Sequence, residues 1–358
     1  MNRPGTVRVF AMIGAAAAAT VCAPPIWSAM ARPKPPPVIY VPPPPPPPAG
    51  PVSLPAHTLA DAAAFQAYME RAVATSPAFV DGPGVAKALK DASAFEPHGL
   101  VRDAVAYGAV AALQDPIFVA AVRDAGDSPD NRRLMVGYLI ADARYALLFK
   151  GSDHAAGLAR EAIGAGGLRL YATGKAIRQA SYDIQHQPWS KEDVLDRPDR
   201  LKMIETQGLQ PPPDAADHVD ALRAAASGAQ PMSLTAAAVP PPYPPLVAES
   251  LQLAAIAALG EASDDLYDRL AGLAEDETTG SCLHEAKLNL FQCVAVAKPH
   301  YEDIYCMGQH AMVDTGACLA TSVGMTVPVE PPPPPPVAKP VPPPKKAVHH
   351  KPVTHKKA

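Results

Sequence analysis

Proline is the feature that most limits what this chain can fold into. The 358 residues include 45 prolines, and most of these stand in clusters. Because proline lacks a backbone N–H and fixes φ, each cluster disfavours helix and sheet and favours extended polyproline II. We therefore expect Pro-rich linkers at 32–55 and 209–245, and a disordered tail rich in Pro, Lys and His at 326–358.

The N-terminus has the pattern of a secretory signal. Arg3 and Arg8 precede a short apolar run at 9–23, and Ala29-Met30-Ala31 fits an A-x-A cleavage site. The apolar run is shorter than the ~20 residues that span a bilayer. We interpret residues 1–31 as a signal peptide and expect export to the periplasm or cell envelope, with no transmembrane span after cleavage. The alternative is an uncleaved anchor.

Between the proline clusters the apolar periodicity is helical. Phe65, Tyr68, Met69 and Ala72 follow the i, i+3, i+4, i+7 pattern of an amphipathic helix, and no run alternates as a strand does. Alanine, the best helix former, is abundant throughout. We predict an all-α protein. Its parts are a bundle of short antiparallel helices at 56–208 and, at 246–325, a helical segment that contains a disulfide-stapled α-hairpin.

Polar residues with capping chemistry indicate where helices begin. Asp115 and Ser128 each precede a proline, which is favourable at the first helical position. Thr58 with Asp61 resembles a capping box. Ser152 and Ser190 are further candidate caps.

All four cysteines that follow the signal lie between residues 282 and 318, and an even number in an exported chain favours disulfides. Lys298-Pro299-His300 breaks two helical runs. In antiparallel helices, facing residues have numbers with a constant sum, and Cys282 with Cys318 gives 600 while Cys293 with Cys306 gives 599. Sequential partners would stand about 16 and 18 Å apart along their own helices, whereas a disulfide needs Cα atoms within ~7 Å. We predict the nested pairing.

One residue of mismatch accompanies this pairing. Cys282 and Cys293 are eleven residues apart, close to three helical turns, whereas Cys306 and Cys318 are twelve apart. Twelve residues rotate the second sulfur by about a third of a turn. We expect Gly316 to let the second helix unwind and bring Cys318 round.

The cysteine spacing is similar to the twin-cysteine helical hairpins of the CHCH family, whose helices each carry a C-x9-C pair. Here the spacings are C-x10-C and C-x11-C. The resemblance implies a helical hairpin over about forty residues and no function. The whole chain resembles proline-rich exported proteins of unknown function from alpha-proteobacteria. Its Lys-Pro and Pro-Pro-Pro composition is similar to the spacer of TonB proteins.

Charge is divided between the body and the tail. Of the 31 basic residues, two precede residue 32 and six follow residue 330, which leaves 23 against all 35 acidic residues, or about −12, between them. The part of the tail beyond Glu330 has about +6 and no acid. We expect it to contact anionic envelope components or acidic protein surfaces, and not nucleic acid; the alternative is a solubilising tail. Its lysines are Lys339, Lys345, Lys346, Lys351, Lys356 and Lys357.

Two groups of residues are candidates for ligand binding. Tyr182, His186 and Trp189 cluster at a helix end and could form a groove for a sugar or peptide; the alternative is a helix-end cap with Trp189 packed as an anchor. Soft metal ligands lie near the cysteines, although cysteines used in disulfides cannot also bind metal. The weak metal candidates are His284, Met307, His310 and Met312.

Catalytic motifs are absent from the sequence. His284-Glu285 begins like H-E-x-x-H, but Leu288 stands at the position of the second histidine, and no G-x-S-x-G or P-loop occurs. We therefore assign no catalytic residue and no cofactor. The sequence favours a non-catalytic cell-envelope protein that binds or tethers. A peptidoglycan- or polysaccharide-active enzyme and a periplasmic copper- or zinc-binding protein stay open, since paired carboxylates leave no motif.

Overall fold

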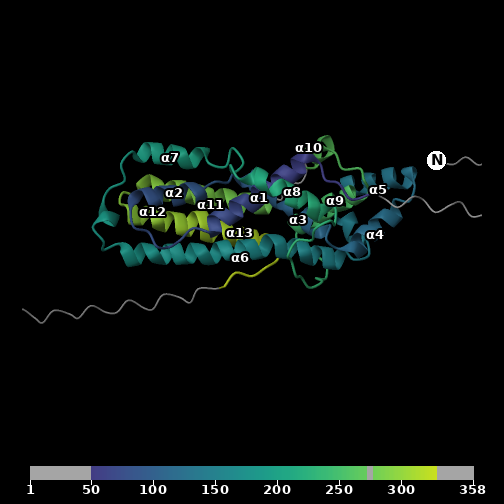
Figure 1. Ribbon diagram of the computed structural model, residues 1–358. Helices are drawn as coiled ribbons and strands as arrows, with labels where there is room; N and C mark the ends of the chain where they lie inside the picture. The colour runs from purple at the N-terminus through teal and green to yellow at the C-terminus, as the bar shows by residue number, and fades with distance from the viewer. Residues whose placement is uncertain (1–49, 272–276, 329–358) are drawn as a thin grey trace, which may run out of the picture. The chain divides into compact units, whose positions relative to one another are not determined.

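The computed structural model describes residues 50–271 and 277–328, and within them the chain is helical (Figure 1). The only β pairing in these ranges is an isolated bridge between Asp193 and Pro299. The expected signal peptide, most of the first linker and the tail lysines lie outside the described residues. The helices are α1 Ala56–Val73, α2 Gly82–Ala92, α3 Pro97–Ala112, α4 Pro116–Ala125, α5 Pro129–Ala141, α6 Ser152–Ile184, α7 Arg197–Thr206, α8 Val219–Ala226, α9 Pro245–Ala258, α10 Asp264–Ala271, α11 Glu277–Val296, α12 His300–Cys306, the π-helical η4 Met307–Asp314 and α13 Thr315–Ser322.

Two of the predicted caps start helices as expected. The Asp115 carboxylate accepts the Phe118 N–H at 2.6 Å, and the Ser128 hydroxyl accepts the Asn131 N–H at 3.2 Å. In both helices the following proline occupies the first position, where its missing N–H costs nothing. The local sequence therefore determines where α4 and α5 begin.

The other three candidate caps behave differently. Thr58 is buried inside α1, because the helix already begins at Ala56 behind Pro55. Ser152 is the first residue of α6, and its hydroxyl donates back to the Leu147 carbonyl at 2.9 Å. Ser190 donates to the Ile184 carbonyl at 2.6 Å, so it closes the end of α6 instead of opening the next helix.

One hydrophobic core runs through both helical regions. Helix α3 packs against α1, α6, α9 and α11, and its small apolar residues let these neighbours approach closely. The same core cluster extends from Val52 to Val323. The segment 209–245, expected as a linker, contains α8 and the short helix η3 Ala215–His218, which pack on α1. The helices before and after this segment therefore stabilise one another.

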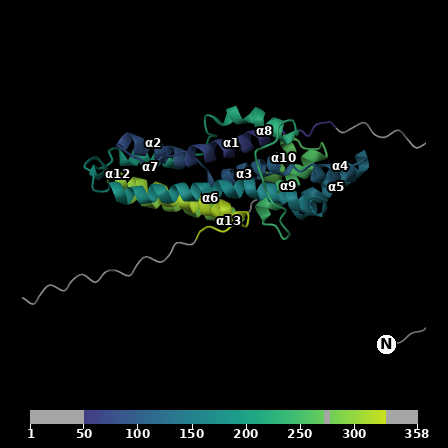
Figure 2. The ribbon, with the colours of Figure 1, turned by 60° about the horizontal axis from the view of Figure 1, so that its bottom comes forward.

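Helix α6 is 33 residues long, an exception among short helices, and it packs against η4 and α13. Figures 1 and 2 both show α13 beside it. Their backbones meet at two glycine pairs, Gly167 with Gly316 and Gly174 with Gly308. A Cβ on Gly316 would lie 2.5 Å from the Tyr171 nitrogen, and a Cβ on Gly308 would lie 2.6 Å from the Arg178 nitrogen. Any side chain at these two contacts would push the helices apart.

The cysteines have the nested pairing, which confirms the disulfide-stapled hairpin. Cys282 is bonded to Cys318 and Cys293 to Cys306, with Cα atoms 5.8 and 5.6 Å apart. The twelve-residue spacing is accommodated by η4, because a π-helical turn takes up one residue more than an α-helical turn. The unwinding therefore precedes Gly316, which is itself α-helical.

The extra residue of the π-helical turn in η4 also accounts for the spacing of the glycine pairs. Gly167 and Gly174 are seven residues apart on α6, while Gly308 and Gly316 are eight apart on the facing segment. The π-helical insertion brings both onto one face. The π-helical segment η4 thus aligns the cysteines with α11 on one side and the glycines with α6 on the other.

Within the described ranges, no single helix is long and apolar enough to cross a membrane. Helices α3 and α4 pass the test of length and composition only as a pair, and the two are bent by 93°.

Candidate functional site

The three residues predicted to form a ligand groove have different surroundings in the structure. Trp189 packs against the core, its ring 6.3 Å from that of His300, and its Nε1 donates to Gln187 at 2.7 Å. This agrees with the anchor alternative. Tyr182 is 51% exposed and contacts Tyr305 edge-on, with ring centroids 6.0 Å apart. His186 is exposed and is not among the residues that line the cavity of about 410 Å³ beside Tyr182.

Tyr182 instead belongs to a different groove, between α6, α11 and α12. Tyr182, Tyr301 and Tyr305 line it together with the Cys293–Cys306 disulfide, and its volume is about 410 Å³. We call it the tyrosine groove. Its lining is largely apolar and aromatic, which suits a rigid, weakly polar ligand. The two added tyrosines follow Tyr182 in sequence by more than a hundred residues, so local pattern did not reveal them.

The metal candidates are not assembled into a site. Met307 and Met312 are fully buried in the core, and His310 is held by Asp314, with Nδ1 and Oδ2 2.8 Å apart. His284 lines a small cavity beside Lys287. No group of three His, Cys, Asp or Glu residues that could hold a metal ion occurs among residues 50–271 and 277–328.

A cleft of about 600 Å³ lies between α1, α3, α9 and α10. Its lining contains four carboxylates, from Asp61, Glu96, Glu249 and Asp268, against one arginine, Arg102. The other polar lining residues are His57, His98, Gln252 and Tyr267. We call this the acidic cleft.

Asp61 is at the centre of the hydrogen bonds in the acidic cleft. Its Oδ2 accepts from Arg102 Nε at 2.8 Å and from the Tyr267 hydroxyl at 2.7 Å. These residues come from α1, α3 and α10. Burial, and then the charge of Asp61, raises the pKa of Tyr267, so this hydroxyl stays a donor. The network joins three helices that are distant in sequence.

Asp103 lies behind this network in a less polar environment. Burial and the nearby charge of Asp61 raise the pKa of Asp103 well above its ordinary value. Its Oδ1 accepts no hydrogen bond, and the Arg102 guanidinium stays 3.8 Å away. Asp61 and Asp103 both line an adjoining cavity of about 250 Å³. Burial and the charge of Asp61 thus favour the neutral form of the Asp103 carboxyl group.

Lys287 is a buried cation outside the acidic cleft. It is only 5% exposed, and its ammonium donates to the carbonyls of Ser93 and Phe95 at 2.5 and 3.0 Å. It also lies 4.7 Å from the Phe95 ring centroid. Burial lowers the pKa of Lys287 to about 7. Its donors are occupied by backbone carbonyls, so we assign it a structural role.

Sequence reasoning missed the acidic cleft, although a signal for it exists. Helix α9, PLVAESLQLAAIAA, is apolar except around Glu249 and Gln252, and Arg102-Asp103 interrupts the small apolar residues of α3. Charged residues inside otherwise buried helices are costly unless they have partners. Such isolated charges therefore indicate a shared polar site.

Comparisons of this chain with family models, with curated proteins and with solved structures find no significant match.

Proposed function

We propose that this is a non-catalytic exported protein of the cell envelope that binds a cationic ligand in the acidic cleft. The excess of carboxylates over cations in the cleft lining carries this proposal. A cleft lined by one sign of charge concentrates ligands of the opposite sign. Two disulfides between helices are typical of an oxidising compartment, which supports export.

Asp268 is the carboxylate best placed to meet such a ligand. Its side chain is 61% exposed, and the His57 Nδ1 is 3.5 Å from its Oδ1. Asp61, by contrast, is engaged by Arg102 and Tyr267. A ligand amine can therefore pair with Asp268 at the entrance, while the inner network keeps the cleft in shape.

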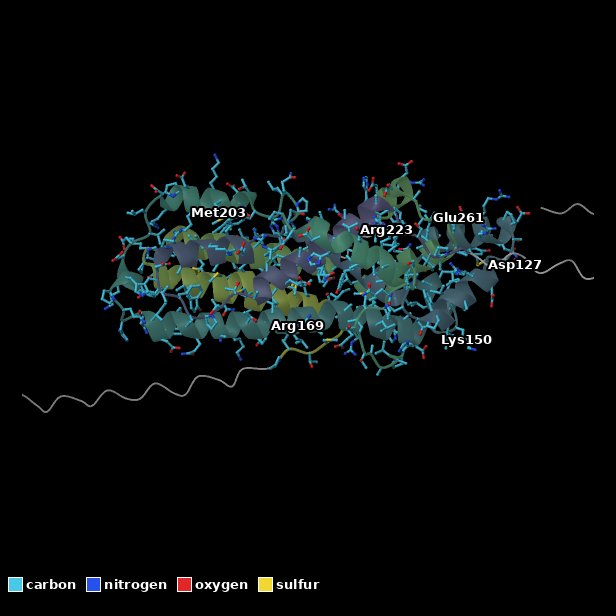
Figure 3. All side chains as sticks on the ribbon, viewed as in Figure 1. Asp127, Lys150, Arg169, Met203, Arg223 and Glu261 are labelled. Carbon is cyan, nitrogen blue, oxygen red and sulfur yellow. A yellow bond between two sulfur atoms is a disulfide. The ribbon has the colours of Figure 1, made fainter. Side chains whose placement is uncertain are left out.

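Calorimetric titration with spermidine, a small polyamine, tests the proposal. We expect binding that weakens as salt is raised, because exposed charges are screened. The variant Asp268→Asn should weaken it several-fold. The matched control is Glu261→Gln, which removes an exposed carboxylate from the loop after α9 (Figure 3) and should bind like the wild type. Equal affinity in both variants, or no binding, overturns the proposal.

The basic tail supplies the tethering part of the proposed function. We expect Lys339, Lys345 and the four lysines that follow to hold the protein to anionic envelope material. Co-sedimentation with phosphatidylglycerol vesicles at low salt should be lost on deletion of residues 331–358, and vesicles of phosphatidylcholine should bind neither form. If the truncated chain sedimented with these vesicles as well as the full-length chain does, the tail would serve only to keep the protein soluble.

A second candidate function is favoured by the two neighbouring carboxyl groups, Asp61 and Asp103. A carboxyl group whose pKa is raised by burial, here Asp103, near a second carboxyl group, here Asp61, is an arrangement that acid–base hydrolysis of polysaccharides uses. Release of soluble fragments from purified peptidoglycan, abolished by Asp103→Asn with the fold intact by circular dichroism, would establish it. In the described ranges, no observation favours a metal-handling function.

A further inference from the structure

The last described residues of the chain lie along α6. The Arg160 guanidinium donates to the Val323 carbonyl at 3.2 Å, and the Tyr171 hydroxyl donates to the Pro328 carbonyl at 3.0 Å. From Val323 to Pro328 the segment therefore advances in the same direction as α6. Figures 1 and 2 both show it leading from α13 toward the end of α6 that lies beside α12.

The face of α6 that this segment follows continues to the tyrosine groove. Arg160, Tyr171 and Tyr182 are eleven residues apart in each step, which is about 20° of rotation per step at 3.6 residues per turn. Tyr182 therefore lies on the stripe that Pro328 already contacts. Its Cα is about 16 Å beyond that of Tyr171, at 1.5 Å of rise per residue.

The sequence after Pro328 matches this distance. An extended polyproline chain advances about 3.1 Å per residue, so about five residues cover the 16 Å. The fifth residue after Pro328 is Pro333, in the middle of the six consecutive prolines at 331–336. The proline run thus has the right offset to meet the tyrosine groove.

The charged residues of the two segments support the same alignment of the chain after Pro328 along α6. Glu330 is the one acidic residue of the sequence after Pro328. Two extended residues cover about four helical residues, so an extended path continued from Pro328 would bring Glu330 beside Lys175 on the same stripe of α6. The Lys175 ammonium is 5.7 Å from the Tyr171 ring centroid, at the point where the described segment ends. Opposite charges would therefore face each other between the last described contact and the groove.

The lining of the groove is of the kind that binds proline. Aromatic-lined grooves recognise polyproline II because this helix is already rigid, so it loses little entropy when it docks. Tyrosine rings offer flat apolar faces to the pyrrolidine rings and hydroxyls to the exposed carbonyls. Three tyrosines within one groove of about 410 Å³ meet this requirement.

We propose that the tyrosine groove binds the proline run 331–336 of the same chain. The run then fixes the point at which the basic tail leaves the helical unit, since Lys339 follows only three residues later. This inference is independent of the ligand of the acidic cleft and of what the lysines contact.

Photo-crosslinking in the full-length chain tests the docking. Tyr182→p-benzoylphenylalanine places a photoreactive ring in the groove, and mass spectrometry of the irradiated protein should locate its product within residues 331–336. The matched control is Tyr138→p-benzoylphenylalanine, on α5, where the native tyrosine is 45% exposed and lies outside the groove. It should give no product with these residues. The yield from position 182 should not change on tenfold dilution, because the contact is within one chain.

Two further variants of the crosslinking protein test the register. Replacing residues 331–336 by alternating Gly and Ser keeps the length and should lower the yield at least fivefold. Lys175→Glu should lower it as well, and adding Glu330→Lys should restore it. Products at 340–344, a yield that falls on dilution with crosslinked dimers, or an unchanged yield in the Gly/Ser variant would each overturn the proposal.

Discussion

The glycine contacts between α6 and α13 lead to a sharp prediction about Gly316. An alanine Cβ at this position would lie 2.5 Å from the Tyr171 nitrogen and 2.6 Å from the Gly167 oxygen. Both atoms belong to the backbone of α6, so no rotamer change can relieve the contact. The helices have to separate by almost an ångström to reach ordinary van der Waals distance, and they lose packing along their contact.

The magnitude follows from two opposing terms. Alanine is favoured over glycine inside a helix by up to about 1 kcal/mol, whereas overpacking of a close contact costs about 1–3 kcal/mol or more. Gly137 provides the matched control, since it lies in α5 and a Cβ there meets no atom within 4 Å. Gly137→Ala should therefore raise the free energy of unfolding by up to about 1 kcal/mol, and Gly316→Ala should lower it by about 1–3 kcal/mol.

Urea denaturation of the oxidised proteins, followed by far-ultraviolet circular dichroism, measures both changes. The slopes of the transitions should agree among the three proteins, so that the midpoints report stability alone. If Gly316→Ala proved as stable as Gly137→Ala, α6 and α13 would not be in backbone contact, and our explanation of η4 would fail with it.

Three other predictions concern the core and the disulfides. Because Lys287 has a pKa of about 7 when folded and an ordinary value of 10.5, the unfolded chain binds more protons between these values. The free energy of unfolding should therefore rise from pH 7 to pH 9 relative to Lys287→Met, by up to about 1.4 kcal/mol per pH unit in denaturation curves. Arg200→Leu leaves the buried Asp303 carboxylate without its ion pair and should cost about 3–5 kcal/mol of stability, which Arg200→Leu with Asp303→Leu should partly recover; equal losses in the two variants would contradict this. Non-reducing peptide mapping should recover Cys282 linked to Cys318 and Cys293 linked to Cys306, and a sequential map would refute the hairpin.

The sequence predicts those parts of the fold that depend on neighbouring residues. Asp115 and Ser128 start helices because cap and first turn are adjacent in the chain. The constant sum of the cysteine numbers predicts the pairing because a turn at Pro299 fixes the register of the two helices beside it. The prediction that Thr58 caps a helix is wrong because the helix begins about one turn earlier, directly after Pro55.

The parts that escaped prediction depend on distant residues. The π-helical segment η4 forms where α6 packs against it, and α6 is more than a hundred residues earlier. The acidic cleft joins Asp61 to Tyr267, about two hundred residues apart, and no short pattern connects them. Tyr182 lines a groove with Tyr301 and Tyr305, which come from the distant hairpin and not from the residues that follow it in sequence.

The shared core has a consequence for when this chain folds. Helix α6 packs most extensively against η4 and α13, the last helices of the described ranges. Helix α3 likewise packs against α9 and α11, which follow it by more than a hundred residues. A chain crossing a membrane from its N-terminus would thus hold an open, glycine-lined face until about residue 320 emerged. Long-range contacts of this kind slow folding, and an exported protein gains from that delay because an unfolded chain is the one that passes through a narrow channel. If the protein is exported as we propose, its helices can reach their native packing only after the last of them has crossed.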